Sequence, residues 1–121
     1  LHIPLNKDNY NFLNEKLLLK LKKGSIFVNT SRGEITDEIA LLNLLKSGQI
    51  SGIGLDVLSD EFNLNPNWLE KNEFRKCSEK GFNIIITPHI GGLTSQSAEK
   101  ANNFIIDKLE KYLQSKKELF N

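Results

Sequence analysis

The chain has 121 residues, a length that suits one domain or part of one. Its 39% hydrophobic and 26% charged content is ordinary for a globular protein, and a net charge of +1 excludes the strong positive field of a nucleic-acid-binding domain. The single cysteine, Cys77, excludes an internal disulfide, so we expect a reducing, cytoplasmic location. No apolar run reaches membrane-spanning length. Because the chain lacks methionine and begins at Leu1, we expect a piece of a longer protein.

The first third of the chain predicts a turn, a helix and a short strand. Residues 1–5 look like the tail of a strand with a turn at Pro4. Asn6 or Asp8 could cap a helical stretch, or Asn14 could cap or restart it, and Gly24 would end it. The apolar positions of that stretch follow helical spacing; they are Phe12, Leu13, Leu17, Leu18 and Leu21. Residues 25–29 form a short apolar run, which predicts a strand covered on both faces.

The middle of the chain predicts a strand–helix–strand unit. Thr36 is the expected N-cap of a helix that ends at Gly48, and residues 53–57 are the next strand. Residues 62–80 are polar, with one or two helical turns expected around Trp68 and Phe74, and residues 83–86 are a third strand. Strands joined by helices with short links predict an α/β fold with a parallel sheet and right-handed crossovers.

A long helix is predicted after Thr94, its expected N-cap. Its apolar residues recur at three- and four-residue spacing, so we expect one buried face; they are Ala98, Ala101, Ile105, Leu109 and Tyr112. The Gly-Gly step before this helix marks the expected domain edge, with residues 1–92 on one side and 93–121 on the other.

Three chemically useful side chains follow the three predicted strands. Arg32 follows the first, Asp56 ends the second, and His89 follows the third. The carboxyl ends of parallel strands are where open α/β sheets bind ligands. Taken singly, each has a structural alternative: Arg32 a surface ion pair, Asp56 a buried acid bonded to backbone amides, His89 an ordinary surface or core histidine. We expect no function of His2, nor of Cys77, which lies in a polar stretch.

Several short motifs, taken in order, resemble the D-isomer-specific 2-hydroxyacid dehydrogenases over nearly the whole chain. The family pattern has a His-x-Pro-Leu string, then Asn-x-x-Arg-Gly, an acidic helix start, Asp-Val followed by Glu-Pro, and Thr-Pro-His with glycines after it. The matching residues here are His2-Ile3-Pro4-Leu5, Asn29-Thr30-Ser31-Arg32-Gly33, Asp37-Glu38, Asp56-Val57, Glu61, Thr87-Pro88-His89, Gly91, Gly92 and Thr94.

The resemblance implies an oxidoreductase that transfers a hydride between NAD(H) and C2 of a small 2-keto or 2-hydroxy acid. Arg32 would bind the substrate carboxylate, His89 would carry the proton, and Glu61 would orient His89 and keep it protonated. Contacts to the cofactor would come from Pro4, Thr30, Ser31, Arg32, Asp56, His89, Gly91 and Gly92. The resemblance also implies a homodimer when the enzyme is full length. It gives no reason to expect a metal site, a membrane or a nucleic acid as partner.

Two departures from the family pattern bear on this interpretation. Phe62 stands where the family has proline, so the loop with Glu61 could be aimed differently. The Gly-x-Gly-x-x-Gly turn and the acidic residue that separates NAD from NADP are not in the chain. We therefore interpret residues 1–92 as the second half of a Rossmann-type domain and residues 93–121 as a helix returning toward a substrate domain. The alternatives are a non-catalytic NAD-binding sensor or interaction protein, and a stand-alone fragment with a scaffold role.

Overall fold

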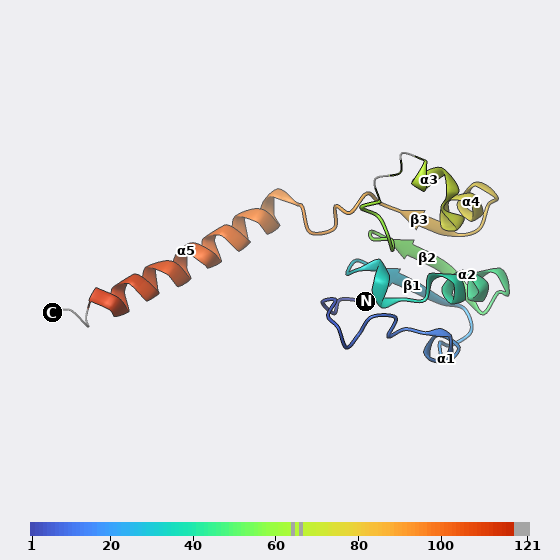
Figure 1. The fold of residues 1–121 in the computed structure, drawn as a ribbon, viewed down its shortest axis with the longest axis horizontal. Helices are drawn as coiled ribbons and strands as arrows, with labels where there is room; N and C mark the ends of the chain where they lie inside the picture. Colours follow the sequence, from blue (N-terminus) through green and yellow to red (C-terminus); the bar gives the residue numbers. More distant parts are fainter. Residues whose placement is uncertain (64, 66, 118–121) are drawn as a thin grey trace. The chain divides into compact units, whose positions relative to one another are not determined.

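The computed structural model describes residues 1–63, 65 and 67–117. Its contacts divide the chain into two compact units, Leu1–His89 and a second that begins at Ile90. The predicted domain edge between residues 92 and 93 stays a prediction. Each unit is described by itself (Figure 1). Within the described part of the chain, no helix is both long and apolar enough to cross a membrane.

The first unit is built on a three-stranded parallel sheet. Its strands are β1 (Ser25–Asn29), β2 (Ile50–Leu55) and β3 (Ile84–Ile86), in the order β1-β2-β3. The predicted α/β fold with a parallel sheet is therefore confirmed. Strand β1 has the predicted bounds, whereas β2 begins three residues earlier than expected and ends at Leu55. Pairing of Phe27 with Ile53, and of Ile53 with Ile84, places all three side chains on one face.

Helices cover that face and form the core. They are α1 (Glu15–Leu18), α2 (Glu38–Lys46), α3 (Trp68–Lys71) and α4 (Glu73–Glu79), with a 3₁₀ turn η1 (Gly33–Ile35) before α2. Helix α2 packs on β2, and α4 packs on β3. The buried cluster joins Phe27 and Ile53 of the sheet to Leu41 of α2 and Phe74 of α4. On the opposite face, Ile26, Val28 and Ile85 are exposed, and the two residues paired with Ile26 and Val28 are glycines of β2.

The N-terminal helix is much shorter than its sequence pattern predicts. Asn14 caps it, accepting a hydrogen bond from the Leu17 amide, and it spans only four residues. Upstream, the Asn11 and Leu13 amides donate to the carbonyls of Glu34 and Ile35, at 2.8 and 2.9 Å. These long-range bonds hold Leu13 in a bridge, and residues 7–11 form turns, so tertiary pairing overrides the helical spacing. Neither Asn6 nor Asp8 starts a helix.

The cap of α2 also differs from the prediction by one residue. The Asp37 carboxylate accepts from the Ala40 amide at 2.9 Å, so Asp37, not Thr36, is the N-cap. Thr36 lies in a bridge with Leu13, and its hydroxyl is buried without a hydrogen-bond partner among the described residues. Once the backbone of Thr36 is drawn into that bridge, the next polar residue caps the helix.

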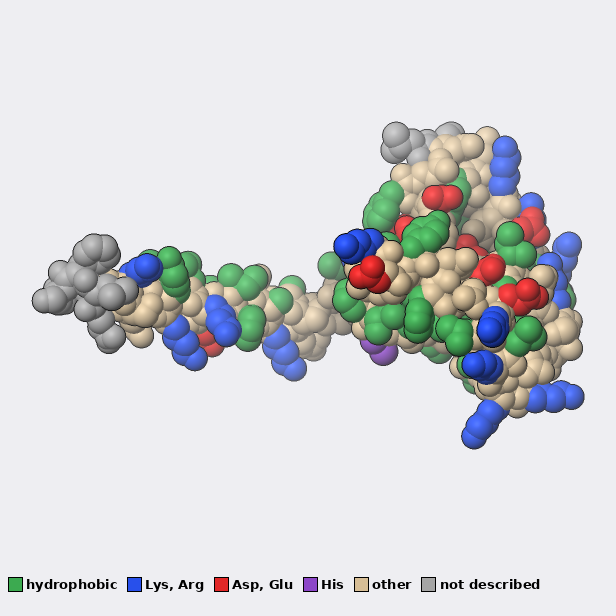
Figure 2. Space-filling model, turned by 60° about the horizontal axis from the view of Figure 1, so that its bottom comes forward, with side chains coloured by type: hydrophobic (Ala, Val, Ile, Leu, Met, Phe, Trp, Pro, Cys, Tyr) green, Lys and Arg blue, Asp and Glu red, His purple; other side chains and the backbone are tan. Residues whose placement is uncertain are grey.

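The second unit contains α5 (Ser95–Lys117). The Thr94 hydroxyl accepts from the Ser97 amide at 3.1 Å, which confirms the predicted N-cap. In this unit taken by itself, the apolar stripe that we expected to be buried is exposed, and it includes Ile105, Leu109 and Tyr112. Figure 2 shows hydrophobic and lysine side chains next to one another along this helix.

Candidate functional site

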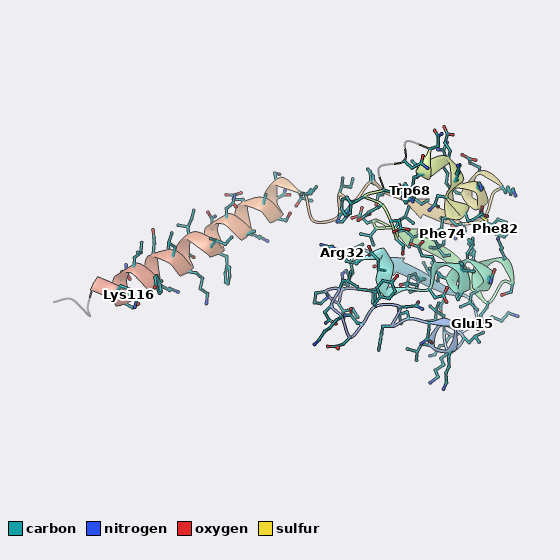
Figure 3. All side chains as sticks on the ribbon, in the orientation of Figure 1. Glu15, Arg32, Trp68, Phe74, Phe82 and Lys116 are labelled. Carbon is teal, nitrogen blue, oxygen red and sulfur yellow. The ribbon has the colours of Figure 1, made fainter. Side chains whose placement is uncertain are left out.

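The three loops that leave the carboxyl ends of the strands are tied to one another by backbone bonds. The Asp56 amide donates to the Asn29 carbonyl, and the Thr87 amide donates to the Leu55 carbonyl, both at 2.9 Å. These bonds extend the parallel pairing beyond the strands. Figure 3 shows Arg32 at this end of the sheet, the end toward which the strand arrows point. Arg32, Asp56 and His89 therefore lie beyond the carboxyl ends of β1, β2 and β3, as the sequence predicts.

Glu61 and His89 are in direct contact across 28 residues of sequence. The Nδ1 of His89 lies 2.6 Å from Oε1 of Glu61, and the two side chains are 36% and 15% exposed. The second carboxylate oxygen of Glu61 accepts from the Leu58 amide at 3.2 Å. A carboxylate only accepts, so Nδ1 is the protonated ring nitrogen and Nε2 is the one that can meet a ligand. His89 has a left-handed backbone, with φ of 53°, a conformation in which histidine is enriched among non-glycine residues.

Phe62 does not misdirect the loop that carries Glu61. Glu61 reaches His89 although Phe62 occupies the position where the family has proline. The Phe62 ring lies beside the imidazole, with ring centroids 6.2 Å apart and the planes tilted by 42°. Because Phe62 is 80% exposed, it forms an apolar wall on one side of His89 rather than a core contact.

Arg32 is exposed at the end of β1, and its backbone is held firmly. The Asn29 side chain donates to the Arg32 carbonyl at 2.9 Å and accepts from the Ser31 amide at 3.0 Å. The guanidinium of Arg32 donates to the Ser31 carbonyl at 2.6 Å. Gly33 follows, and a Cβ there would lie 2.1 Å from the Ser59 amide nitrogen. The loop with Arg32 therefore touches the turn that leads to Glu61.

An open pocket of about 370 Å³ lies beside Arg32. Four predicted cofactor-binding residues line it; they are Pro4, Thr30, Ser31 and Arg32. His2 also lines it, and its Nδ1 lies 3.1 Å from the Thr30 hydroxyl oxygen. Sequence reasoning assigned no function to His2. Its place in the His-x-Pro-Leu string was the available signal. The Ser31 hydroxyl donates to the Ile3 carbonyl and anchors the pocket wall.

Asp56 is buried and has at least one structural partner. The Thr87 hydroxyl donates to its Oδ1 at 2.5 Å, which links the ends of β2 and β3. This contact supports the structural alternative and does not contradict a second contact to a ligand. Gly91 and Gly92, the remaining predicted cofactor residues, lie in the second unit. Among the described residues, no three His, Cys, Asp or Glu side chains gather as a metal-binding group.

Glu38 contacts the same turn, and sequence reasoning assigned it no more than a place in the acidic helix start. Its Oε1 accepts from the Ser59 amide at 2.7 Å. Burial raises the pKa of the Glu38 carboxyl above its ordinary value, and the Ser59 amide and hydroxyl partly offset that rise in pKa. The sequence carried no signal for this contact, since 21 residues separate its partners.

Comparison with known proteins agrees with this geometry. Residues 1–91 match the NAD binding domain of the D-isomer specific 2-hydroxyacid dehydrogenases. Glycerate dehydrogenase of Methylorubrum extorquens is 34% identical over 116 residues, which cover 96% of this chain and 35% of that protein. An acyclic imino acid reductase solved with NADPH and D-Arg superposes with a TM-score of 0.71 at 34% identity, covering 95% of this chain and 34% of that one.

A D-lactate dehydrogenase from Aquifex aeolicus, solved with NAD and lactic acid, gives a TM-score of 0.67 at 30% identity and covers 95% of this chain and 36% of its own. The chain thus spans about a third of the length of the relatives it matches. It is homologous to part of an NAD(P)-dependent oxidoreductase. On the match over residues 1–91, the chain belongs to the D-isomer specific 2-hydroxyacid dehydrogenase family, in its NAD binding domain.

Proposed function

We propose that this chain supplies the acid–base pair and the carboxylate-binding arginine of an NAD-dependent D-2-hydroxyacid dehydrogenase. The contact between His89 Nδ1 and Glu61 Oε1 carries the proposal. It orients an imidazole at the carboxyl ends of parallel strands, where its Nε2 can meet a ligand. A partly exposed ion pair of purely structural value contributes little to stability. The position of this pair beyond the carboxyl ends of the strands is better explained by chemistry.

In the reductive direction, His89 would act as an imidazolium with both ring nitrogens protonated. It would donate its Nε2 proton to the oxygen of the substrate's C2 carbonyl and keep the Nδ1 proton that faces Glu61. In the oxidative direction, the same nitrogen would take the proton of the hydroxyl group. Glu61 would hold the imidazole at Nδ1 throughout, and Arg32 would bind the substrate carboxylate through two parallel hydrogen bonds. To do so, Arg32 would exchange its present bond to the Ser31 carbonyl for the substrate.

The residues of this chain suit the nicotinamide end of the cofactor but not its pyrophosphate. The pocket beside Arg32 joins polar residues to the apolar Ile3, Pro4 and Leu5, which suits the nicotinamide end of NAD. The Gly-x-Gly-x-x-Gly turn that binds a pyrophosphate is not in this sequence, and the paired glycines 52 and 54 lie inside β2. When bound, NAD(H) supplies or accepts the hydride. One relative was solved with NADPH and another with NAD, so both cofactors belong in the assay.

Steady-state kinetics of a complete enzyme that carries this chain would test the proposal, with small 2-keto acids and with NADH or NADPH. His89→Ala should lower kcat by about 10²–10⁴, because it removes the general acid and base. Arg32→Lys keeps the charge but loses the planar fork, so it should raise KM and also lower kcat. Size-exclusion chromatography with light scattering would test the expected homodimer.

Glu61→Gln has a matched control in its neighbour Asp60→Asn. Both changes remove one negative charge from the same turn, and Asp60 has a left-handed backbone that asparagine also adopts readily. Glu61→Gln should lower kcat and alter the pH profile, and Asp60→Asn should do neither. Undiminished turnover in His89→Ala would refute the acid–base role. Cofactor binding by a parent enzyme that turns over no 2-keto acid would favour the sensor alternative.

A further inference from the structure

Residues 58–61, the turn that carries Glu61, are closed by two long hydrogen bonds, and a 2.8 Å bond from the Asn63 amide to the Asp60 carbonyl follows them. The Glu61 amide donates to the Leu58 carbonyl at 3.3 Å, and the Leu58 amide donates back to the Glu61 side chain at 3.2 Å. Both distances lie at the long end of the hydrogen-bond range. Asp60, within the turn, has φ of 58°, a conformation that few non-glycine residues adopt. An external contact at residues 58–59 would therefore add to the bonds that fix the geometry of this turn.

Glu38 supplies a stronger contact from outside the turn. Its Oε1 lies 2.7 Å from the Ser59 amide nitrogen, shorter than either bond inside the turn. Hydrogen bonds to an ionised acceptor are about twice as strong as neutral ones. Ser59 is two residues before Glu61, so the amide that Glu38 holds lies at the centre of the turn.

Glu38 is not needed to begin its own helix. Asp37 already caps α2 through the Ala40 amide at 2.9 Å. Burial of the Glu38 carboxylate opposes its ionisation and raises its pKa, and the charges of Glu34 and Asp60 raise the pKa further. A solvated glutamate at the same helical position would interact with the helix dipole without that cost. The orientation of Glu38 toward Ser59 is therefore explained by the turn rather than by the helix.

Gly33 brings the two loops close enough for this bond. A Cβ at position 33 would lie 2.1 Å from the Ser59 amide nitrogen and 2.2 Å from the Leu58 carbonyl carbon, distances that no side chain tolerates. The backbone next to Arg32 thus lies against the backbone that Glu38 holds. This backbone contact joins the loop with Arg32 to the turn with Glu61.

We propose that Glu38 is a positioning residue of the candidate active site, which holds the Ser59 amide and thereby fixes the turn that presents Glu61 to His89. The catalytic meaning of this inference rests on the proposed function. Its structural content, that Glu38 sets the contact between Glu61 and His89, does not depend on turnover.

Two substitutions at Glu38 separate the effect of side-chain length from the effect of negative charge. Glu38→Gln keeps the length of the side chain and an acceptor oxygen for the Ser59 amide but loses the charge. Glu38→Asp keeps the negative charge at the helix start but withdraws the carboxylate by one methylene. Both residues are tolerated in the first turn of a helix, so both variants should fold. Glu34→Gln is the matched control, because it removes a nearby charge from η1 without touching the turn.

Nitrogen-15 NMR of the 121-residue chain is the first arm of the test. Glu38→Asp should speed hydrogen exchange of the Ser59 amide about 10-fold or more and shift the His89 Nδ1 resonance, as the bond to Glu61 weakens. Glu34→Gln should leave both signals close to those of the parent. Glu38→Gln keeps the reach but has a weaker, neutral acceptor, so it should change both signals less than Glu38→Asp does. The opposite pattern, with Gln disruptive and Asp harmless, would overturn the proposal in favour of a helix-charge role. Unchanged signals in all three variants would overturn it as well.

Kinetics of a complete enzyme that carries the chain are the second arm. Glu38→Asp should lower kcat about 10- to 100-fold, the usual cost of misplacing a catalytic group by about 1 Å, with KM for the cofactor unchanged. Glu38→Gln should retain most of the kcat of the parent enzyme. If His89→Ala keeps full activity, the proposed function fails, and the NMR arm still decides whether Glu38 sets the geometry of the pair. If Glu38→Asp separates Glu61 from His89 by NMR but leaves kcat unchanged, the positioning role itself is refuted.

Discussion

Gly33→Ala is the sharpest perturbation that the structure offers. The added Cβ would meet backbone rather than a movable side-chain end: Ser59 N at 2.1 Å, Leu58 C at 2.2 Å and Leu58 O at 2.8 Å. Ordinary contact begins at 3.4 Å, so the two loops must separate by about 1 Å or more. That separation would stretch the bond from Ser59 to Glu38, now 2.7 Å, beyond hydrogen-bond range.

The expected cost follows from these two effects. Overpacking of a tight contact costs about 1–3 kcal/mol, and loss of a hydrogen bond to a charged group costs about 1.5–3 kcal/mol. The two costs do not add in full, because the loop movement that relieves the overpacking is the same movement that breaks the hydrogen bond. We therefore expect the free energy of unfolding to fall by about 2–4 kcal/mol. In urea this corresponds to a midpoint lower by roughly 1–2 M.

Fluorescence of Trp68 during urea unfolding of the 121-residue chain measures this loss. Trp68 is the only tryptophan, and it packs against the core (Figure 3). Gly54→Ala is the matched control, because its Cβ would meet only Val28 side-chain atoms at 3.5 Å and above, an ordinary contact. The control should unfold at or slightly above the urea midpoint of the parent. Equal urea midpoints for Gly33→Ala and Gly54→Ala would refute the close packing of Gly33 against the backbone of residues 58 and 59.

Three further predictions concern other parts of the chain. Burial raises the pKa of Glu38, so between its ordinary value of 4.5 and the raised pKa the folded state binds more protons and stability falls as pH rises. Glu38→Gln removes this loss, so its unfolding free energy relative to the parent should increase from about pH 4 to pH 7; an unchanged difference would contradict burial of the charge. Asp56→Ala removes the carboxylate that accepts a hydrogen bond from the Thr87 hydroxyl at 2.5 Å. The loss of this bond should lower the melting temperature by at least about 4 °C. If cofactor affinity in the complete enzyme survives that change, Asp56 is structural alone. The isolated chain, without a pyrophosphate-binding turn in its sequence, should bind NAD weakly or not at all, and micromolar affinity by calorimetry would contradict this.

Sequence reasoning was most successful where local chemistry and burial agree. Residues 25–29 are a short apolar run bounded by a glycine turn, and β1 has those bounds. Thr94 precedes a long periodic stretch and caps α5 as expected. The run before Gly24 predicts a longer helix than the one that forms, because apolar spacing cannot reveal that Asn11 and Leu13 pair with a segment more than twenty residues away. Propensity is a weak guide where long-range backbone bonds compete with a helix.

The sequence by itself determined the α/β class, the family and the placement of Arg32 and His89 after successive strands, because the succession of strands and helices and the spacing of motifs are read directly along the chain. Only the tertiary structure decided that Glu61 reaches His89 despite Phe62, that His2 lines the pocket, and that Glu38 holds Ser59. Each of these contacts joins residues 21 to 28 positions apart that lie on different elements or loops. Their geometry depends on how closely the loops pack, and that is set by the absence of a side chain at Gly33 and by the pairing of three strands, neither of which a pattern of residue types contains.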